Sequence, residues 1–539
     1  MFQTIAPRAN DPMVPARPIL TGIPRIALVG GGPTSLYALQ QLIEHDTPLE
    51  VHILEKESHI GPGMPYRDDL NDPAMLANIA GRELPALTEP LHDWLASRDA
   101  ETLAEMGLRR HDISAETFFP RVVLGRYFTA QFARMVARGR AMGHVLHLRT
   151  RHAVRDICVT DRVSIDWQTP NGPGGATFDH VVLATGHEWP KETTASGITM
   201  QAPWPADGLR ACIGRRVGVL GTSLTAIDAA VALVGFHGDF VEEGASVRWT
   251  PHEPLGDFHI TLMSRKGLLP PADWYYTLPL PELRNFNPDT VADDIAQGEE
   301  GLLLRCLEHL AQDLIEVDDP RARALDLTCV EGLADRFFAE RLTQDAWEAS
   351  RMDLKTALSN RAVNRPDPWR MALLRAHEVF ESAIPHMSQG DRALFGRELT
   401  PIFTDCYASV PHRSIRRILA LKDVGVLDLM RLGTDYAMTP AGNGVQIDHA
   451  HGSLTVDRMV DARGQSPTDF TSLFPGLTSA AARLDFDPVT CAVSLPKSCR
   501  GSLSCLSIPV LLPTDPFVQG LERARDLGHM AAQRILSLL

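Results

Sequence analysis

Residues 25–57 read RIALVGGGPTSLYALQQLIEHDTPLEVHILEKE. The apolar run at 26–29 is typical of a strand buried on both faces, because no polar residue interrupts it. The glycine turn GGGPTS follows at 30–35, and a helical stretch then leads to a second apolar strand at 51–54. This order predicts a βαβ unit that binds a dinucleotide.

Each position of the turn has a physical reason. Gly30 allows the tight turn, and Gly32 lets the backbone approach a pyrophosphate. The helix that begins at Pro33 and Thr34 presents the positive end of its dipole to that anion. Ser35 stands where a third glycine is usual, and it is small enough for the helix to pack closely on the strand.

The residue after the second strand predicts which nucleotide the turn accepts. Glu55, followed by Lys56, lies 25 positions beyond Gly30, close to the roughly 20 expected for an acid that accepts hydrogen bonds from ribose hydroxyls. An acid there disfavours a 2′-phosphate. The alternative is a plain strand-to-helix connection that binds nothing.

Residues 216–234, RVGVLGTSLTAIDAAVALV, repeat this design. The turn Gly221-Thr222-Ser223 follows an apolar strand, although the middle glycine of the fingerprint is missing. We expect a second nucleotide site here.

The next strand, at 260–263, ends in Ser264, Arg265 and Lys266. A serine and two cations suit a 2′-phosphate, so NADPH is expected in preference to NADH. The interval between turn and cations is long, and we interpret residues 235–257 as a loop insertion. The alternative for the cations is a solvated basic turn.

A third strand, at 180–183, ends in a small-residue turn that contains Thr185 and Gly186. Small residues here allow the backbone to lie close to a cofactor, and an ordinary strand-end turn is the alternative.

Three further positions are candidate catalytic or cofactor-binding residues. Asn78 lies in an apolar stretch, residues 75–81, that either covers a cofactor or packs as a surface loop, and it is the candidate catalytic residue. Arg121, at the start of an amphipathic helix to about residue 141, faces either cofactor phosphate or solvent. Asp515 precedes a C-terminal helix whose N-terminus would stabilise a reduced flavin, or which simply packs.

The composition excludes several classes of protein. A net charge of −15 argues against binding of nucleic acid or an anionic membrane. Eight cysteines without a C-x-x-C pair argue against a disulfide framework, a zinc ribbon and a dithiol centre, so a reducing cytoplasm is the expected compartment. No apolar run approaches the roughly 18 residues of a membrane span. The histidine pairs at 144/147 and 449/451 lack motif partners, and no metal site is expected.

The pattern changes along the chain. The proline-rich residues 1–23 are expected to be a disordered tail. Residues 24–200 form the first nucleotide-binding domain, residues 201–289 the second, and residues 290–423 an all-α insertion whose apolar faces recur at helical spacing. Short strands, with turns at Asn443-Gly444 and His451-Gly452, then return the chain to the first domain over residues 424–539.

Taken together, GGGPTS, DHVVLATGH, VGVLGTSLTAIDAA and ITLMSRKGLLP resemble the FAD- and NAD(P)-binding family that includes the bacterial FAD-dependent urate hydroxylase. The similarity to lysine and ornithine N-hydroxylases is more distant. The more particular marks are SRKGLLP at 264–270 and F-x-P-R with a following G-x-Y at 118–127. The resemblance implies an α/β two-dinucleotide-binding flavoprotein fold, with FAD on the first turn and NADPH on the second.

The resemblance also implies a monooxygenase. NADPH would reduce the flavin, and a flavin hydroperoxide would transfer one oxygen atom of dioxygen to a small-molecule substrate. Two other classes stay open: an NAD(P)H oxidase or flavin-dependent dehydrogenase without oxygen insertion, and a non-catalytic flavin-binding redox sensor.

Overall fold

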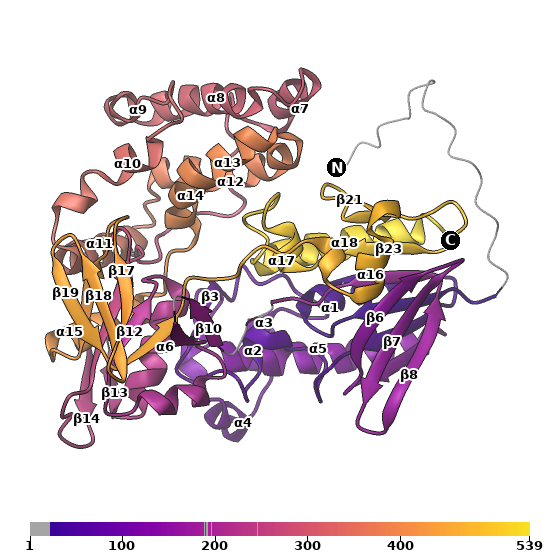
Figure 1. The fold of residues 1–539 in the computed structure, drawn as a ribbon, viewed down its shortest axis with the longest axis horizontal. Helices are drawn as coiled ribbons and strands as arrows, with labels where there is room; N and C mark the ends of the chain where they lie inside the picture. The colour runs from indigo at the N-terminus through magenta and orange to yellow at the C-terminus, as the bar shows by residue number, and fades with distance from the viewer. Residues whose placement is uncertain (1–21, 188, 190–191, 196, 245) are drawn as a thin grey trace.

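Two mainly parallel sheets and a body of helices make up the chain (Figure 1). The computed structural model describes residues 22–187, 189, 192–195, 197–244 and 246–539. The expected tail therefore lies almost entirely outside the described residues. Figure 1 shows the first sheet and its small companion sheet at the right, the second sheet with α11 at the left, and helices α7–α10 and α12–α14 above them.

The first sheet contains the predicted βαβ unit. Strand β1 pairs in parallel with β2 on one side and with β9 on the other, so the strand order reverses at β1. Ligands of open α/β sheets bind at the carboxyl ends of the strands at such a point. The full order is β21 (Asp485–Asp487), β22 (Ala492–Ser494), β23 (Ser502–Cys505), β9 (His180–Leu183), β1 (Arg25–Val29), β2 (Glu50–Leu54) and β5 (Val145–Arg149).

Both faces of β1 are buried, as its apolar run predicts. Ile26 and Leu28 pack with helices α1 (Pro33–Leu42), α5 (Arg121–Ala141) and α18 (Leu521–Leu536). Ala27 and Val29 face the opposite core, which includes the small sheet β6 (Ala153–Val159), β7 (Val163–Thr169) and β8 (Gly172–Phe178).

Helix α18 crosses α1 at close range. A Cβ on Gly528 would lie 2.6 Å from the carbonyl oxygen of Thr34, so only glycine permits this crossing. The C-terminal helix is therefore fixed directly on the helix that follows the glycine turn.

The second sheet repeats the arrangement around β12. This strand lies between β20 and β15, all three in parallel, and the order again reverses at the strand that precedes a glycine turn. Helix α6 (Leu224–Gly235) follows the turn. The order is β10 (Glu192–Ala195), β11 (Ile198–Gln201), β20 (Arg458–Asp461), β12 (Arg216–Leu220), β15 (His259–Ser264) and β16 (Leu427–Arg431).

One expected domain boundary differs from the sheet topology. Strands β16 and β20 pair with β15 and β12, so residues 427–431 and 458–461 lie in the second sheet, whereas we expected the first domain to resume at 424. Isolated strand patterns carry no mark of the sheet that they join. The expected turns are confirmed in the sheet β17 (Ala437–Ala441), β18 (Gly444–His449) and β19 (Gly452–Val456).

The expected loop at 235–257 is instead mostly an ordered hairpin. Strands β13 (Gly238–Glu243) and β14 (Ser246–Pro251) pair in antiparallel register. Trp249 of β14 is buried in the core of the second sheet. The hairpin explains the long interval between the second glycine turn and Arg265.

The helical region divides between two cores. Helices α11 (Ala346–Ala362) and α15 (His412–Asp423) join the core of the second sheet. The others have a core of their own, and the apolar face predicted between Leu302 and Leu314 is buried in it. They are α7 (Pro288–Ala296), α8 (Leu302–Val317), α9 (Asp319–Leu325), α10 (Leu333–Phe338), α12 (Pro368–Ala383), α13 (Gln389–Glu398) and α14 (Thr400–Tyr407).

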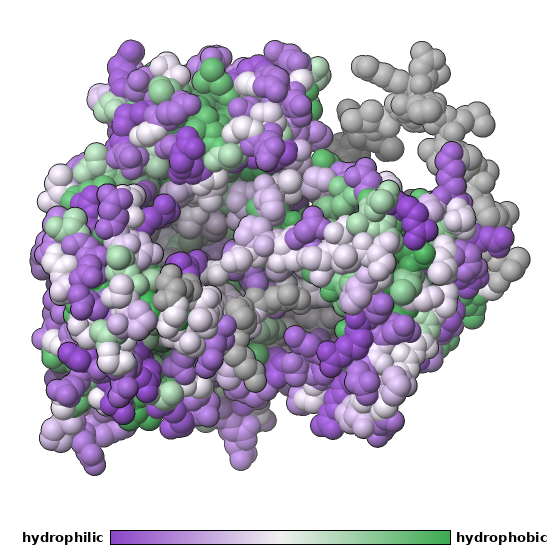
Figure 2. All heavy atoms as spheres, in the orientation of Figure 1, coloured by the Kyte–Doolittle hydropathy of each residue, from purple (hydrophilic) through white to green (hydrophobic). Residues whose placement is uncertain are grey.

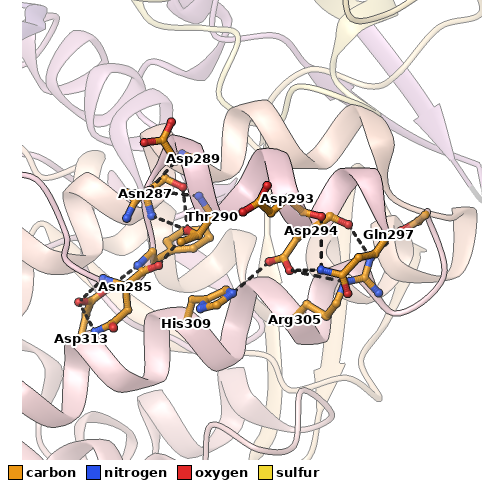
Figure 3. Close-up of polar contacts among 12 residues, drawn as sticks. Asn285, Asn287, Asp289, Thr290, Asp293, Asp294, Gln297, Arg305, His309 and Asp313 are labelled. Atoms are coloured by element: carbon orange, nitrogen blue, oxygen red, sulfur yellow. Dashed lines mark hydrogen bonds and ion pairs between the residues drawn. The ribbon is translucent and has the colours of Figure 1, made fainter.

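Buried carboxylates fix the chain where it enters this helical body (Figure 3). Asp313 of α8 accepts hydrogen bonds from the backbone amides of Asn285 and Phe286, at 3.0 and 2.8 Å. The side chain of Asn287 caps α7, and Asp294 of α7 lies 3.4 Å from Nε2 of His309 in α8. The entry segment therefore has a defined path from the second sheet.

The insertion lies at the carboxyl edge of the second sheet, the edge at which open α/β sheets bind their ligands. The chain leaves the carboxyl end of β15, forms the separate helical core, and returns through α15 to β16, which is parallel to β15. The insertion thus interrupts one β-α-β crossover. Figure 2 shows a surface hollowed where the two sheets and the helical body meet.

Candidate functional site

The first glycine turn is held by its own neighbours. Gly30 has φ +102°, and a Cβ there would lie 2.2 Å from the carbonyl oxygen of Ala184, at the end of β9. The hydroxyl of Ser35 donates to the carbonyl of Gly30 at 2.6 Å. Ser35 therefore stabilises the turn, which is why a polar residue suits this position.

The start of α1 is open to an anion. Gly32 is the N-cap, no side chain caps the helix, and Pro33 occupies its first turn. A Cβ on Gly32 would lie 3.3 Å from Cα of Gly63, so the backbone of residues 61–63 runs directly over the turn. Amide groups at such an uncapped start bind phosphate.

Glu55 lies where the fingerprint predicts it and is 9 % exposed. Its Oε2 accepts a hydrogen bond from the amide of Gly31 at 2.8 Å, and its Oε1 accepts one from the amide of Glu57 at 2.9 Å. Each carboxylate oxygen has a second lone pair, so a ribose contact is compatible with this role. Lys56 is exposed. Both contacts with nucleotide stay predictions.

The turn after β9 lies against the first glycine turn. Thr185 donates its hydroxyl hydrogen bond to Ser507 at 3.0 Å, and Gly186 has φ +70° with open space on the side of its missing Cβ. The glycine is therefore required by its backbone conformation, and the open side leaves room for a cofactor.

Two of the predicted site residues have a buried side-chain oxygen without a hydrogen-bond partner in the part of the chain that the structure describes. Oδ1 of Asn78 and Oδ1 of Asp515 are buried and have no hydrogen-bond partner among the described residues. Buried acceptors of this kind are rare without a ligand or water. With the uncapped start of α1, they fit a bound dinucleotide cofactor.

Asp515 has an additional partner that the sequence did not indicate. Its Oδ2 accepts a hydrogen bond from Nε of Arg523 at 2.6 Å, while burial raises the pKa of the carboxyl. Phe517, two residues on, is buried in the core of the helical body. This segment therefore joins the first sheet to the helices.

The second glycine turn has the geometry of the first. Gly221 has φ +134°, and its Cβ would lie 2.6 Å from the carbonyl oxygen of Ala462, at the end of β20. Ser223 takes the place of Gly32 as the N-cap, with φ −100° and ψ −159° against −86° and −176°. Because neither φ is positive, the missing middle glycine costs nothing in backbone conformation.

The two cations after β15 have different surroundings. Thr222 donates to the hydroxyl of Ser264 at 3.2 Å, which links the second turn to the end of β15. Arg265 is exposed, whereas Nζ of Lys266 lies 3.6 Å from the ring centroid of Phe338 in the helical body. Burial lowers the pKa of Lys266. Of the two cations, Arg265 is therefore the one left for a phosphate.

The side chain of Arg121 lies in an ion pair and not in solvent, while its contact with cofactor phosphate stays a prediction. Its Nε donates to Oδ2 of Asp228 at 3.0 Å, and its Nη2 lies 2.9 Å from the same oxygen. The side chains are 14 % and 9 % exposed. Arg121 begins α5 beside the first sheet and Asp228 lies on α6 beside the second, so this ion pair joins the two halves.

The other family mark in α5 is also a packing feature. A Cβ on Gly125 would lie 2.0 Å from the carbonyl oxygen of Tyr66 in α2 (Gly63–Tyr66), and Tyr127 donates to the carbonyl of Glu89 at 2.6 Å. These residues hold the segment that runs over the first turn.

One cluster has the composition of a metal site. Glu50, His52 and His147 bring ligand atoms within 4.8 Å of one another. Nδ1 of His52 accepts a hydrogen bond from Arg149 at 3.0 Å, and burial lowers the pKa of His52 to about 4. The proton of the neutral ring therefore lies on Nε2, which contacts Glu50 at 2.7 Å and has no free lone pair.

Comparison with known proteins gives the family. Residues 27–188 match the model described as FAD-NAD(P)-binding, and residues 287–407 match the YdhS-like middle domain. The chain is 32 % identical to the uncharacterized protein YdhS of Escherichia coli (strain K12) over 520 residues, 95 % of this chain and 97 % of the other. The chain belongs to the YdhS family.

Two solved structures are similar to the chain over nearly their full length. The ornithine N-hydroxylase KtzI of Kutzneria sp. 744 is similar over 96 % of this chain and 99 % of its own, with a TM-score of 0.50 and 14 % identity. The ornithine hydroxylase PvdA of Pseudomonas aeruginosa covers 95 % of this chain and 100 % of its own, with a TM-score of 0.48 and 12 % identity. The likeness to KtzI, together with the match to the FAD-NAD(P)-binding model, gives the fold of two-dinucleotide-binding flavoproteins.

The cofactors follow from the family and the two turns: they are FAD and NAD(P). The expected likeness to N-hydroxylases is confirmed at the level of fold, while the resemblance to the urate hydroxylase family stays an expectation. Within the described residues, every helix is too short or too polar to cross a membrane. Sequence reasoning missed Asp228 and Arg523, because each is recognisable only through a partner distant in sequence.

Proposed function

We propose that this protein is an FAD-dependent, NADPH-using monooxygenase that hydroxylates a small molecule. The observation that carries the proposal is the presence of two equivalent glycine turns, at Gly30 and Gly221, each at the reversal point of its own parallel sheet. The fold shared with the ornithine N-hydroxylase KtzI over nearly the full length of both chains supports it.

The cofactors supply the redox chemistry when bound: NADPH gives a hydride to the flavin, and dioxygen then gives one atom to the substrate and one to water. The protein's part is to bind and orient these groups and to exclude water. In this proposal Gly30, Gly32 and Glu55 hold the ADP half of FAD, and Ser223 and Arg265 hold NADPH. Asn78 and Asp515 offer their unpartnered oxygens to the flavin side.

The helical body is proposed to cover the place where flavin and substrate meet. It begins at the carboxyl end of β15, the edge at which the nucleotide of the second turn would lie. Phe517, from the C-terminal segment, and Trp274, from the segment after β15, are both buried in its core. A cover there would keep water from the reduced flavin during reaction with dioxygen.

We also propose domain limits from the sheets. The FAD-binding part comprises residues 22–187 and 462–539, and the NAD(P)-binding part comprises residues 192–286 and 408–461. Residues 287–407 form the helical body. Eight free cysteines suit a reducing cytoplasm as the compartment.

A disulfide reductase on the same fold would need a dithiol that exchanges with the flavin. The sequence has no C-x-x-C pair, and all eight cysteines are free. An NAD(P)H oxidase would use the same nucleotide-binding residues as the monooxygenase, so it stays the alternative function.

Anaerobic titration with NADPH tests the proposal. Purified protein should carry the absorbance of FAD and lose it on addition of NADPH. After air is admitted, a panel of small amines and heterocycles is assayed for products 16 mass units heavier, with hydrogen peroxide measured in parallel. Peroxide equal to the NADPH consumed with every compound would favour the oxidase, and no bleaching by NADPH or NADH would refute both.

A further inference from the structure

Two arginines lie together at the carboxyl edge of the second sheet. Arg265 follows β15, and Arg431 ends β16, the neighbouring strand. In the register of these strands Ser264 is the partner of Arg431. Both arginines are exposed, and neither side chain has an ion pair or hydrogen bond within the part of the chain that the structure describes.

The backbone fixes this juxtaposition. After β16 the chain stays bonded to β15: the amide of Leu432 donates to the carbonyl of Ser264 at 2.9 Å, and that of Gly433 to the carbonyl of Arg265 at 3.1 Å. A Cβ on Gly267 would lie 2.7 Å from Cβ of Arg431. The turn after Arg265 is therefore folded directly onto Arg431.

The same turn is linked to the nucleotide-binding turn. The hydroxyl of Ser264 accepts from the amide of Gly267 at 3.0 Å and from the hydroxyl of Thr222 at 3.2 Å. Ser264 occupies the place in the second sheet that Glu55 occupies in the first, since Leu54 pairs with Val29 and Met263 with Leu220. A ribose on the second turn would thus have its 2′ position beside Ser264.

Unpaired neighbouring cations repel each other, and this chain has an excess of acids, with a net charge of −15. Arginines elsewhere on the surface have carboxylate partners, for example Arg216 with Asp457 and Arg323 with Asp319. Two guanidinium groups without one, at the end of a nucleotide-binding strand, suit a dianionic phosphate, which each can bind through two hydrogen bonds.

We propose that Arg431 forms, with Arg265, a two-arginine site for the 2′-phosphate of NADPH. The inference rests on the proposed function and assigns to β16 a specificity residue for it. Lys266, the other cation after β15, contacts Phe338 and takes no part.

Calorimetric titration of the FAD-loaded full-length protein tests this site without turnover. The probes are adenosine 2′,5′-bisphosphate, which carries the 2′-phosphate, and 5′-AMP, which lacks it. Arg431→Ala should weaken binding of the bisphosphate by about 10-fold or more and leave AMP unchanged, because a charge-assisted contact is lost. Arg265→Ala should do the same, and Arg431→Lys should lose part of the affinity.

The matched control is Arg155→Ala. Arg155 is exposed on β6, beside the other sheet, and its removal changes the net charge equally. Its bisphosphate affinity should equal that of the wild type.

The outcomes separate the claims. Loss in Arg265→Ala with none in Arg431→Ala would overturn the role of Arg431 and keep the NADPH preference. Equal affinity of the wild type for both probes would overturn the two-arginine site, while bleaching of the flavin by NADH would show that the oxidoreductase proposal survives. Circular dichroism confirms that each variant is folded.

Discussion

Replacing Arg121 by alanine should loosen the contact between the two nucleotide-binding parts and leave FAD binding intact. The change removes the cation from a buried pair in which Asp228 is 9 % exposed. Breaking a buried pair costs about 3 to 5 kcal/mol, because the remaining charge has no compensation. Arg121 itself is 14 % exposed, so we take the lower value, about 3 kcal/mol.

Hydrogen exchange read by mass spectrometry measures this loss locally, since a chain with several cores has no single unfolding free energy. A loss of about 3 kcal/mol corresponds to roughly 100-fold faster exchange of α6 amides that open with the interface. Hydride transfer should also slow, because misplacement of the two rings is costly.

The defect should depend on pH. Burial raises the pKa of Asp228, and Arg121 lowers it. Without Arg121 the folded pKa rises further, so the stability of the variant falls as the pH rises from the ordinary pKa of 3.8 to that folded pKa. The difference in exchange from the wild type should therefore be larger at pH 8 than at pH 5.5.

The control is Arg121→Ala combined with Asp228→Leu, which leaves no buried charge. Exchange of α6 in this double variant should be slower than in Arg121→Ala alone. Equal exchange in both variants, or a loss of FAD in Arg121→Ala, would refute the interface role and return Arg121 to the cofactor.

Three further results are expected. Gly32→Val should give protein without FAD absorbance, because its methyl groups would fill the phosphate site beneath residues 61–63, whereas Gly208→Val, at an open position with negative φ, should stay yellow. Replacing residues 287–407 by a short Gly/Ser linker should divert NADPH oxidation to hydrogen peroxide if the shortened protein stays yellow; retained coupling would assign the helices to another role. Burial raises the pKa of Asp273 to about 7, above its ordinary 3.8, so its stabilising contribution is lost as pH rises through about 7, and Asp273→Asn should flatten that part of the stability profile.

The sequence predicted the elements that carry strong local patterns. The strands at 26–29 and 51–54, the helix from Arg121 to about 141 and the apolar face between Leu302 and Leu314 all form as expected. In each case the spacing of the apolar residues shows which faces of the strand or helix are buried in the core. Glu55 and Gly221 could be placed for the same reason, since they follow directly from a strand end.

The remainder depended on contacts that no local pattern reports. The strand at 458–461 joins the second sheet because β12 offers it an edge, yet its four residues would fit either sheet. Arg121 is followed by a helix whether it faces phosphate or Asp228, and its partner lies 107 positions away. Arg431 is separated from Arg265 by the whole helical body, so only the sheet register joins them.

The two nucleotide sites share one backbone plan and differ in the side chains at the strand ends. Gly30 and Gly221 both lie against the carbonyl oxygen at the end of the neighbouring strand, which forces glycine at both positions. Position Glu55 in one sheet corresponds to Ser264 in the other, and in the proposed function this difference sets the preference for a free ribose or a phosphorylated one. Both side chains also bond to their own glycine turn, Glu55 through the amide of Gly31 and Ser264 through the hydroxyl of Thr222. In this proposal the same two positions therefore hold the turn and select the nucleotide.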